Sequence, residues 1–263
     1  MTTPLDTVAA PVDAIYLSPH LDDAAFSCGG QIHARARRGE RVSIVTLFAG
    51  PAPPGAELSA FASDLHRRWG LDSGDAVAVR RGEDRLAAQS LGAACVQLDL
   101  PDAIYRVDRR GVPLYTASAV LFGDPAEDDG AVEAPLRAAL EALPATAFVA
   151  APLGIGGHVD HAIVHRLARE VVPRDRLWFY EDFPYAESWR VRRRAMARHR
   201  GWETRVETID EADLDAKSRA FACYASQLGS DWSDAVARER RLRRFHRRRG
   251  GERLWRSPPP ASG

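Results

Sequence analysis

The sequence predicts an α/β fold of the Rossmann-like type, in which a mainly parallel sheet is flanked by helices on both faces. Three observations support this prediction. Short apolar runs alternate with helical stretches of roughly 10–15 residues. The 263 residues, 45% of them hydrophobic, are enough for one substantial core. No internal repeat or linker divides the chain. Alternating strands and helices form right-handed βαβ units, which bind ligands outside the carboxyl ends of their strands.

The predicted fold begins at residues 14–18, AIYLS, an apolar run typical of a buried strand. After a polar turn, a helical pattern covers residues 24–38, and Gly39 is well placed to end that helix. Residues 42–48 are rich in β-branched side chains and predict the second strand. The segment 50–63 holds three prolines and two glycines, so we expect a loop there.

The rest of the chain continues this alternation. Helices are expected at 64–70, 81–92, 129–142, 161–169, 211–227 and 232–248. Strands are expected at 95–100, 146–151, 176–181 and 203–209. Residues 101–127 form a long irregular segment near the expected ligand edge, either a substrate lid or a surface decoration. Residues 183–201 show no clear period.

Residues 14–256 are expected to form a single domain. A lead-in of residues 1–13 and a proline-rich tail of residues 257–263 are expected to be disordered. The lead-in lacks the basic and apolar regions of a signal peptide, and no stretch approaches the ~20 apolar residues of a membrane span. We therefore expect a cytoplasmic protein without stable membrane insertion. Its oligomeric state is left open.

The composition narrows the choice of partners. Lysine and arginine balance aspartate and glutamate at 36 residues each, which argues against nucleic acid as a partner. Cys28, Cys95 and Cys223 are far apart, so buried thiols are expected rather than disulfides or a cysteine zinc site. Between Arg238 and Arg249 lie eight arginines, either a solvated helix face or a patch for an anionic ligand or membrane surface.

The first candidate motif, His20-Leu21-Asp22-Asp23, directly follows the first predicted strand. A catalytic zinc ion takes three nitrogen or oxygen ligands from the protein and keeps one position open. An imidazole and a carboxylate three residues later can reach one ion from a tight turn. The second carboxylate, Asp22, then lies beside the metal without binding it, which suits a general base.

The second candidate motif, His158-Val159-Asp160-His161, follows the predicted strand at 146–151. Two histidines three residues apart share one face of a helical turn. One of them can complete the metal site, and the other can donate a hydrogen bond to a tetrahedral oxyanion. Asp160 can orient one of the two imidazoles.

Either motif alone has a purely structural explanation, because aspartates after a strand are common helix N-caps. Both motifs, however, follow strands of one predicted parallel sheet and so fall on the same edge of it. Three of the eight histidines occur in these two turns. Their joint occurrence predicts a metal site.

The two turns also resemble the signatures of a known family. Residues 18–23, SPHLDD, resemble the P/A-H-x-D-D signature of the PIG-L (LmbE-like) family. That family comprises N-acetylglucosaminyl-phosphatidylinositol de-N-acetylases and bacterial relatives in mycothiol, bacillithiol and antibiotic biosynthesis. Residues 156–161, GGHVDH, resemble its second signature, G-H-x-D-H. Further similar segments lie at 80–92, 100–103, 180–185 and 217–227.

This resemblance implies a Rossmann-like fold and a zinc ion bound by His20, Asp23 and His161, although similar ligands also accept Fe²⁺ or another divalent metal. It implies Asp22 as the general base and His158 as the residue that stabilises the oxyanion. The implied reaction is hydrolysis of an N-acyl group, in the first place N-acetyl, from an amino sugar or glycosylated metabolite.

The resemblance further implies that Asp160 tunes His158 and that Arg80 and Asp102 hold sugar hydroxyls. One position departs from the family pattern. Some relatives carry a tyrosine two residues before the second histidine motif, and Gly156 stands there in this chain.

Two other function classes compete with the hydrolase. A non-hydrolytic family member could bind a sugar conjugate or run another metal-assisted reaction in the same pocket, but it has no need of both Asp22 and His158. A nicotinamide-dependent oxidoreductase would carry G-x-G-x-x-G after the first strand, where residues 18–23 stand instead.

Overall fold

The computed structural model describes residues 11–53, 55–72 and 74–259. The predicted disordered lead-in and tail fall largely outside these ranges, at residues 1–10 and 260–263. Along the described chain, no helix is both long and apolar enough to cross a bilayer.

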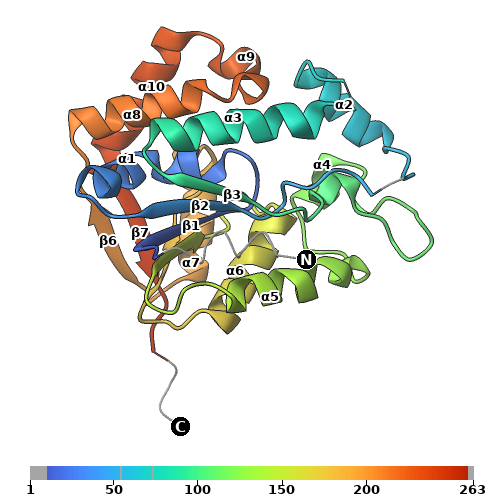
Figure 1. The fold of residues 1–263 in the computed structure, drawn as a ribbon, viewed down its shortest axis with the longest axis horizontal. Coiled ribbons are helices and arrows are strands. Elements are labelled where there is room, and N and C mark those ends of the chain that lie inside the picture. Colours follow the sequence, from blue (N-terminus) through green and yellow to red (C-terminus); the bar gives the residue numbers. More distant parts are fainter. Residues whose placement is uncertain (1–10, 54, 73, 260–263) are drawn as a thin grey trace.

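Within the described residues, seven strands form one sheet in the order β3-β2-β1-β4-β5-β7-β6 (Figure 1). Neighbouring strands from β3 to β5 run parallel, and β7 is antiparallel to both β5 and β6. The prediction of a mainly parallel α/β sheet is therefore confirmed. The strands are β1 (Ala14–Ser18), β2 (Val42–Thr46), β3 (Ala94–Gln97), β4 (Phe148–Pro152), β5 (Leu177–Tyr180), β6 (Glu203–Glu207) and β7 (Glu252–Arg256).

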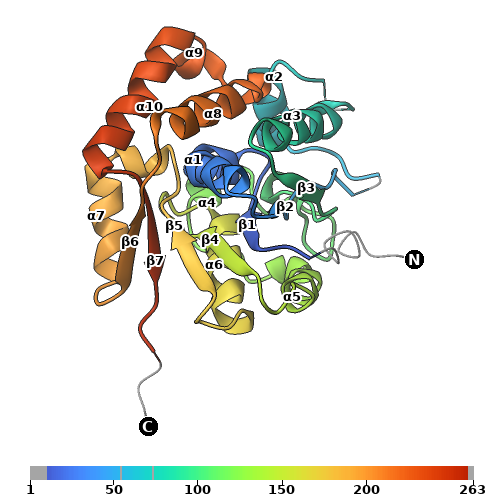
Figure 2. The same ribbon diagram turned by 60° about the vertical axis from the view of Figure 1, so that its left-hand side comes forward.

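Helices cover both faces of the sheet (Figures 1 and 2). One face packs against α1, α3, α8 and α10, and the other against α5, α6 and α7. The α-helices are α1 (Asp23–Arg37), α2 (Ala60–Arg68), α3 (Ala76–Ser90), α4 (Ser118–Leu121), α5 (Glu133–Glu141), α6 (Val159–Val171), α7 (Trp189–Arg198), α8 (Glu211–Ala222), α9 (Gly229–Trp232) and α10 (Ala235–Arg249). Short 3₁₀ turns are η2 (Ala103–Tyr105), η3 (Asp129–Val132), η4 (Tyr185–Glu187) and η5 (Ala225–Gln227).

Strand β1 shows why the sheet needs helices on both sides. Ile15 and Leu17 point into the core beneath α5 and α6, whereas Ala14 and Tyr16 point into the core beneath α1 and α8. Every residue of β1 is buried. A strand of a parallel sheet buried on both faces reads as a continuous apolar run, which is why the sequence predicts it so clearly.

Several helix boundaries differ from the sequence prediction. Helix α2 begins at Ala60, inside the expected loop 50–63, because the Ser59 hydroxyl accepts a hydrogen bond from the Ala62 backbone N–H and caps the helix. Helix α3 begins at Ala76, five residues before the expected start at 81.

Two longer elements, α7 and β7, are absent from the sequence prediction, as are the four-residue helices α4 and α9. Residues 189–198, which lack a clear period in sequence, form α7, a helix with five arginines and no buried residue. Strand β7 follows the arginine-rich α10, and its two buried hydrophobic residues, Leu254 and Trp255, are flanked by charged residues that obscure a strand pattern.

The topology fixes where the site lies. Strands β2 and β3 extend the sheet to one side of β1, while β4 and β5 extend it to the other side. The chain turns that leave β1 and β4 therefore lie next to each other at the carboxyl edge, at the point where the strand order reverses. Such a switch point is where open α/β sheets form their ligand-binding crevice.

Candidate active site

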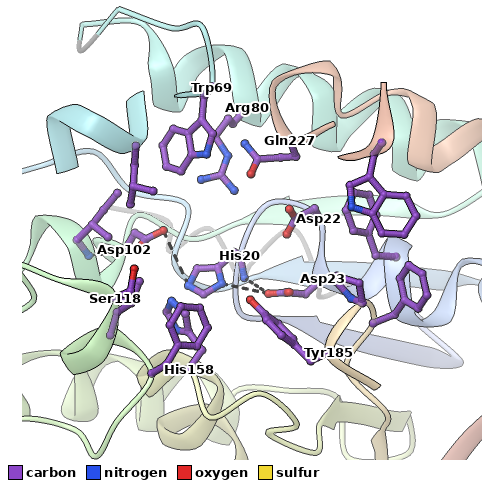
Figure 3. A pocket seen from close by; sticks show the side chains of 18 of the residues that line it. His20, Asp22, Asp23, Trp69, Arg80, Asp102, Ser118, His158, Tyr185 and Gln227 are labelled. Carbon is purple, nitrogen blue, oxygen red and sulfur yellow. Dashed lines mark hydrogen bonds and ion pairs between the residues drawn. The ribbon is translucent and has the colours of Figure 1, made fainter. Parts of the chain in front are cut away.

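The turn after β1 is held by a small network around Ser18. Its hydroxyl donates to the His20 carbonyl at 2.6 Å and accepts from the Ala24 N–H at 3.0 Å. The His20 N–H in turn donates to Asp23 Oδ2 at 2.8 Å. These contacts fold the motif so that the side chains of His20 and Asp23 point into one cavity (Figure 3).

The turn after β4 contains three glycines, and His158 follows them as the N-cap of α6. Gly156 has φ of 105°, and an added Cβ there would meet the Tyr185 ring at 2.6 Å. Only glycine combines this conformation with the close approach of the ring. His158 Nδ1 accepts a hydrogen bond from the Asp160 N–H at 3.2 Å, and His161 lies in the first turn of α6.

The two turns meet at the carboxylate of Asp23. Its Oδ2 lies 3.2 Å from His20 Nδ1 and 3.1 Å from His161 Nε2. All three residues are buried. The structure thus brings together the three residues that the sequence resemblance implied as zinc ligands.

The outer nitrogen of each imidazole is held by a further carboxylate. His20 Nε2 lies 2.9 Å from Asp160 Oδ2, and His161 Nδ1 lies 2.7 Å from Asp182 Oδ1. Carboxylates in this outer position fix the tautomer and ring orientation of metal-binding histidines. The inner nitrogens, which face Asp23, are then free to bind a cation.

Asp160, which the resemblance implies as the residue that tunes His158, makes its side-chain contacts with other residues. Its carboxylate accepts from His20 and from the Ala103 N–H at 3.1 Å, and pairs with Arg106 Nη2 at 2.5 Å. Towards His158 it contributes its backbone N–H and the field of its charge. The reason is geometric, because Asp160 lies one residue into α6 and points across to the turn after β1.

The donor set fits a divalent ion. Ligand atoms about 2.0–2.1 Å from a tetrahedral ion lie roughly 3.3 Å apart, close to the two spacings around Asp23. Burial lowers the pKa of His161, but the charge of Asp23 and the hydrogen bond to Asp182 outweigh it and raise the pKa to about 10. A site that stabilises positive charge this strongly suits a metal cation. Two other donor sets have ligand atoms within 4.8 Å of one another, one made of His20, His158 and His161 and the other of His20, Asp102 and Asp160.

Asp22 lies beside this group and accepts no hydrogen bond through its carboxylate from any residue that the structure describes. Burial and the charge of Asp23 raise the pKa of Asp22 to about 7, against the opposing charges of Arg80 and His20. A carboxylate with a raised pKa is a stronger proton acceptor than an ordinary aspartate.

His158 is held as a neutral imidazole. Burial and the neighbouring charge of His20 lower the pKa of His158 well below its ordinary value. Because Nδ1 accepts the Asp160 N–H, the proton of the neutral ring belongs on Nε2. His158 therefore offers one N–H donor at the cavity rather than a positive charge.

A cavity of about 310 Å³ opens over these residues. Arg80 and Asp102 both line it, where the sequence resemblance places substrate contacts. Arg80 is 7% exposed and lies over the Trp69 ring at 4.5 Å, with no carboxylate partner among the described residues. Asp102 Oδ2 lies 3.9 Å from His20 Nε2. The remaining wall includes Phe26, Phe61, Leu65, Ile104, Ser118, Leu121, Phe122, Phe183, Pro184, Tyr185, Gln227 and Trp232.

Two segments singled out by the resemblance hold each other in place at this wall. Glu83 of α3 accepts from the Ser226 N–H and hydroxyl at 2.8 and 2.5 Å, and Asp84 accepts from the Tyr224 hydroxyl at 2.8 Å. These bonds fix α3, which carries Arg80, against the turn that carries Gln227.

The long segment 101–127 forms part of the cavity wall. Tyr105 and Tyr115 are 5% and 2% exposed, so the segment has a packed interior of its own. Its Arg106 is buried and pairs with Asp129 as well as Asp160. Between the open alternatives of lid and decoration, the structure favours a fixed wall, to which Ser118 contributes directly.

The sequence analysis missed four groups at this site. Arg106 and Trp69 lie more than 40 residues from the two motifs, and Asp182 and Tyr185 lie 21 and 24 residues after His161, so spacing alone could not assign them. The resemblance at 180–185 was the one signal for Asp182 and Tyr185.

Comparison with known proteins shows the family to which this chain is related. The family model for GlcNAc-PI de-N-acetylase, PIG-L, matches residues 15–172. The chain is 34% identical over 256 residues to 2'-N-acetylparomamine deacetylase of Streptomyces fradiae. The aligned region covers 92% of this chain and 80% of that protein.

Solved structures show the same relationship. A deacetylase of the teicoplanin biosynthesis pathway, in complex with bog, superposes with a TM-score of 0.75 at 28% identity, over 95% of this chain and 100% of that one. The zinc-inhibited form of teicoplanin deacetylase Orf2 superposes with a TM-score of 0.73 at 27% identity, over 95% of this chain and 100% of that one. With a family model that matches more than half of its residues, this chain belongs to the PIG-L family of GlcNAc-PI de-N-acetylases.

Proposed function

We propose that this chain is a metal-dependent hydrolase that removes an N-acyl group, in the first place N-acetyl, from an amino sugar or a glycosylated metabolite. One observation carries the proposal. The Asp23 carboxylate lies between two imidazoles whose outer nitrogens are held by carboxylates, with Asp22 and His158 in the same cavity. The relatives named above are deacetylases, one of them of an N-acetylated amino sugar.

His20, Asp23 and His161 would hold the metal ion, and zinc fits their nitrogen and oxygen donors best. Fe²⁺ is accepted by similar donors. When bound, the ion supplies Lewis acidity that polarises the acyl carbonyl and makes water nucleophilic at neutral pH. Asp160 and Asp182 orient the two imidazoles and act as positioning residues for this centre.

Asp22 serves as the general base. It lies next to Asp23 in sequence, lines the cavity and has no competing hydrogen bond within the described chain. In this role its carboxylate takes the proton of the attacking water and can return it to the leaving amine. General bases of this kind typically contribute about 10²–10⁴-fold in rate.

His158 stabilises the oxyanion with its Nε2–H. Its backbone-bonded Nδ1 fixes the tautomer, so the donor is oriented before the substrate arrives. A preorganised donor of this kind costs no reorganisation during the reaction.

Arg80, Asp102 and Trp69 bind the sugar. The buried Arg80 guanidinium lacks an acidic partner, so its N–H groups are available for substrate oxygens. Asp102 accepts from sugar hydroxyls on the other side of the cavity. Trp69 supplies a flat apolar surface beside them.

The proposal is tested by acetate release. Purified protein is incubated with a panel of N-acetyl amino sugars and glycosides, before and after treatment with a chelator and after return of Zn²⁺. We expect acetate release that a chelator abolishes and Zn²⁺ restores. Sugar binding without acetate release would instead favour the non-hydrolytic alternative.

A further inference from the structure

A second cavity adjoins the active site on the far side of Phe122. It measures about 530 Å³ and lies between α7 and the glycine turn 154–157. Phe122 lines both cavities, and its ring packs edge-on against His158 at 5.3 Å between centroids. Phe122 is thus the residue that the two cavities share, and it separates the catalytic histidine from the second cavity.

Three arginines of α7 line that cavity, Arg190, Arg194 and Arg198. We call them the arginine row. Their spacing of four residues places them on one face of the helix, over a length of ~12 Å. All three are exposed, and no carboxylate in the described part of the chain lies within 4.0 Å of their guanidinium groups. The cavity has no acidic lining residue either.

The floor of the cavity is backbone. An added Cβ at Gly154 would meet no heavy atom within 4 Å, and one at Gly157 would meet only the Phe122 carbonyl, at 3.7 Å. The space in front of the arginine row is therefore open at Gly154 and Gly157, whereas the Tyr185 ring closes off the side at Gly156. The result is an open cationic recess directly beside the catalytic turn.

The arginines that the sequence singled out, on α10, behave differently. Arg243 pairs with Glu211, Asp215 and Glu239, and Arg241 pairs with Glu187. Much of that charge is neutralised within the protein. Arg240, Arg244 and Arg248 stay exposed, but the cavities that they line share no residue with the active-site cavity.

We propose that the arginine row is a substrate subsite for a phosphoryl or pyrophosphoryl group, so that the N-acylated amino sugar is bound as a phosphorylated or nucleotide-linked sugar. This inference rests on the proposed deacetylase function, and it further specifies that the substrate carries a negatively charged group. Guanidinium groups bind phosphate oxygens through paired N–H donors. The three guanidinium groups carry three positive charges, which suits a phosphoryl group with more than one negative charge better than a single carboxylate.

The test compares two triple variants of the full chain. Arg190→Gln/Arg194→Gln/Arg198→Gln removes the arginine row. Arg240→Gln/Arg244→Gln/Arg248→Gln removes the same charge, at the same spacing, from exposed positions of α10. Because α7 has no buried residue, the first variant should fold as well as the second. Circular dichroism and thermal unfolding check this before any comparison.

Binding of inorganic pyrophosphate is measured first, by isothermal titration calorimetry at two salt concentrations. We expect the row variant to bind about tenfold or more weakly than wild type, with a smaller salt dependence, and the α10 variant to stay within about twofold. Equal binding by wild type and row variant, or equal losses in the two variants, would overturn the subsite.

Acetate release is then compared for N-acetylglucosamine 1-phosphate, UDP-N-acetylglucosamine and the uncharged methyl glycoside. Wild type should prefer a phosphorylated substrate by about tenfold or more in kcat/KM, and the row variant should lose that preference while it hydrolyses the methyl glycoside unchanged. The better of the two phosphorylated compounds identifies the source of the phosphate. Equal rates on all three would refute the subsite and leave the deacetylase intact. If none of the three compounds releases acetate, the calorimetry alone decides the subsite, and the wider panel of N-acetyl amino sugars decides the deacetylase.

Discussion

Asp182 Oδ1 accepts a hydrogen bond from His161 Nδ1 at 2.7 Å, and this contact joins the segment after β5 to the first turn of α6. The other oxygen of Asp182 accepts from the Ile155 N–H at 2.7 Å. One carboxylate thus positions both the glycine turn and an imidazole that faces Asp23. The geometry of the metal site therefore depends on a residue outside both histidine motifs.

The first prediction follows from that contact. Asp182→Asn keeps the shape of the side chain but removes its charge, so the affinity for Zn²⁺ should fall about 10–100-fold. Competition with a chromogenic chelator measures this. Asp13→Asn, at an exposed carboxylate paired with Arg41, is the control and should leave the affinity unchanged. Unaltered affinity in Asp182→Asn would rule out a positioning role.

A second prediction concerns the buried pair of Asp160 and Arg106, which are 0% and 4% exposed. Asp160→Asn leaves the Arg106 charge buried with Asp129 alone, and should lower the free energy of unfolding by roughly 3–5 kcal/mol. Urea unfolding measures the loss. In the double variant with Arg106→Met the total loss should be smaller than the sum of the single losses. Additive losses would mean that the two residues act independently.

Asp22→Asn is predicted to keep bound zinc and the fold, while kcat falls about 10²–10⁴-fold. The reason is that an amide cannot take a proton from water, although it fills the same space. Metal analysis and steady-state acetate release are measured on the same preparation. If the variant retains near-normal kcat, another residue is the base.

Two substitutions of His158 separate its roles. Asn preserves an acceptor at the N-cap of α6, whereas Ala removes it and should lower stability by about 1 kcal/mol. Both variants lack the Nε2–H, so both should lose about 10²–10³-fold in kcat and keep one zinc ion per chain. Loss of the ion from both would favour the alternative set in which His20, His158 and His161 bind the metal.

The last prediction concerns pH and stability. His165 donates from Nδ1 to the Pro152 carbonyl at 3.0 Å and packs on Phe179, and its burial lowers the pKa to about 4. An unfolded histidine titrates near 6.5, so the unfolded chain binds more protons between these values. The contribution of His165 to the free energy of unfolding is therefore complete above about pH 6.5, and it is lost as the pH falls from there through 4. Urea unfolding of His165→Gln should therefore show a weaker loss of stability over this range, and an unchanged pH profile would contradict it.

The local chemistry of the site was predictable because it is encoded in two short turns. His20 and Asp23 lie in one turn, and His158 and His161 in the other, each directly after a strand with a clear apolar run. A parallel sheet places such turns on one edge, so their meeting follows from the strand pattern.

The supporting contacts were not predictable in the same way. Arg106 reaches Asp160 from a segment without regular structure, and Asp182 reaches His161 from a different strand connection. Neither contact leaves a period or a spacing in the sequence. The same holds for α7, whose five arginines mask its helical pattern and so concealed the arginine row.

The central claim is that His20, Asp23 and His161 bind one metal ion in a catalytic cavity. Anomalous diffraction at the zinc edge from crystals of the zinc-loaded protein tests it most directly. The account predicts one peak, with His20 Nδ1, an Asp23 oxygen and His161 Nε2 each about 2.0–2.2 Å from it. A peak that one of these three residues does not contact, or a fully active protein that gives no peak there, would contradict the account.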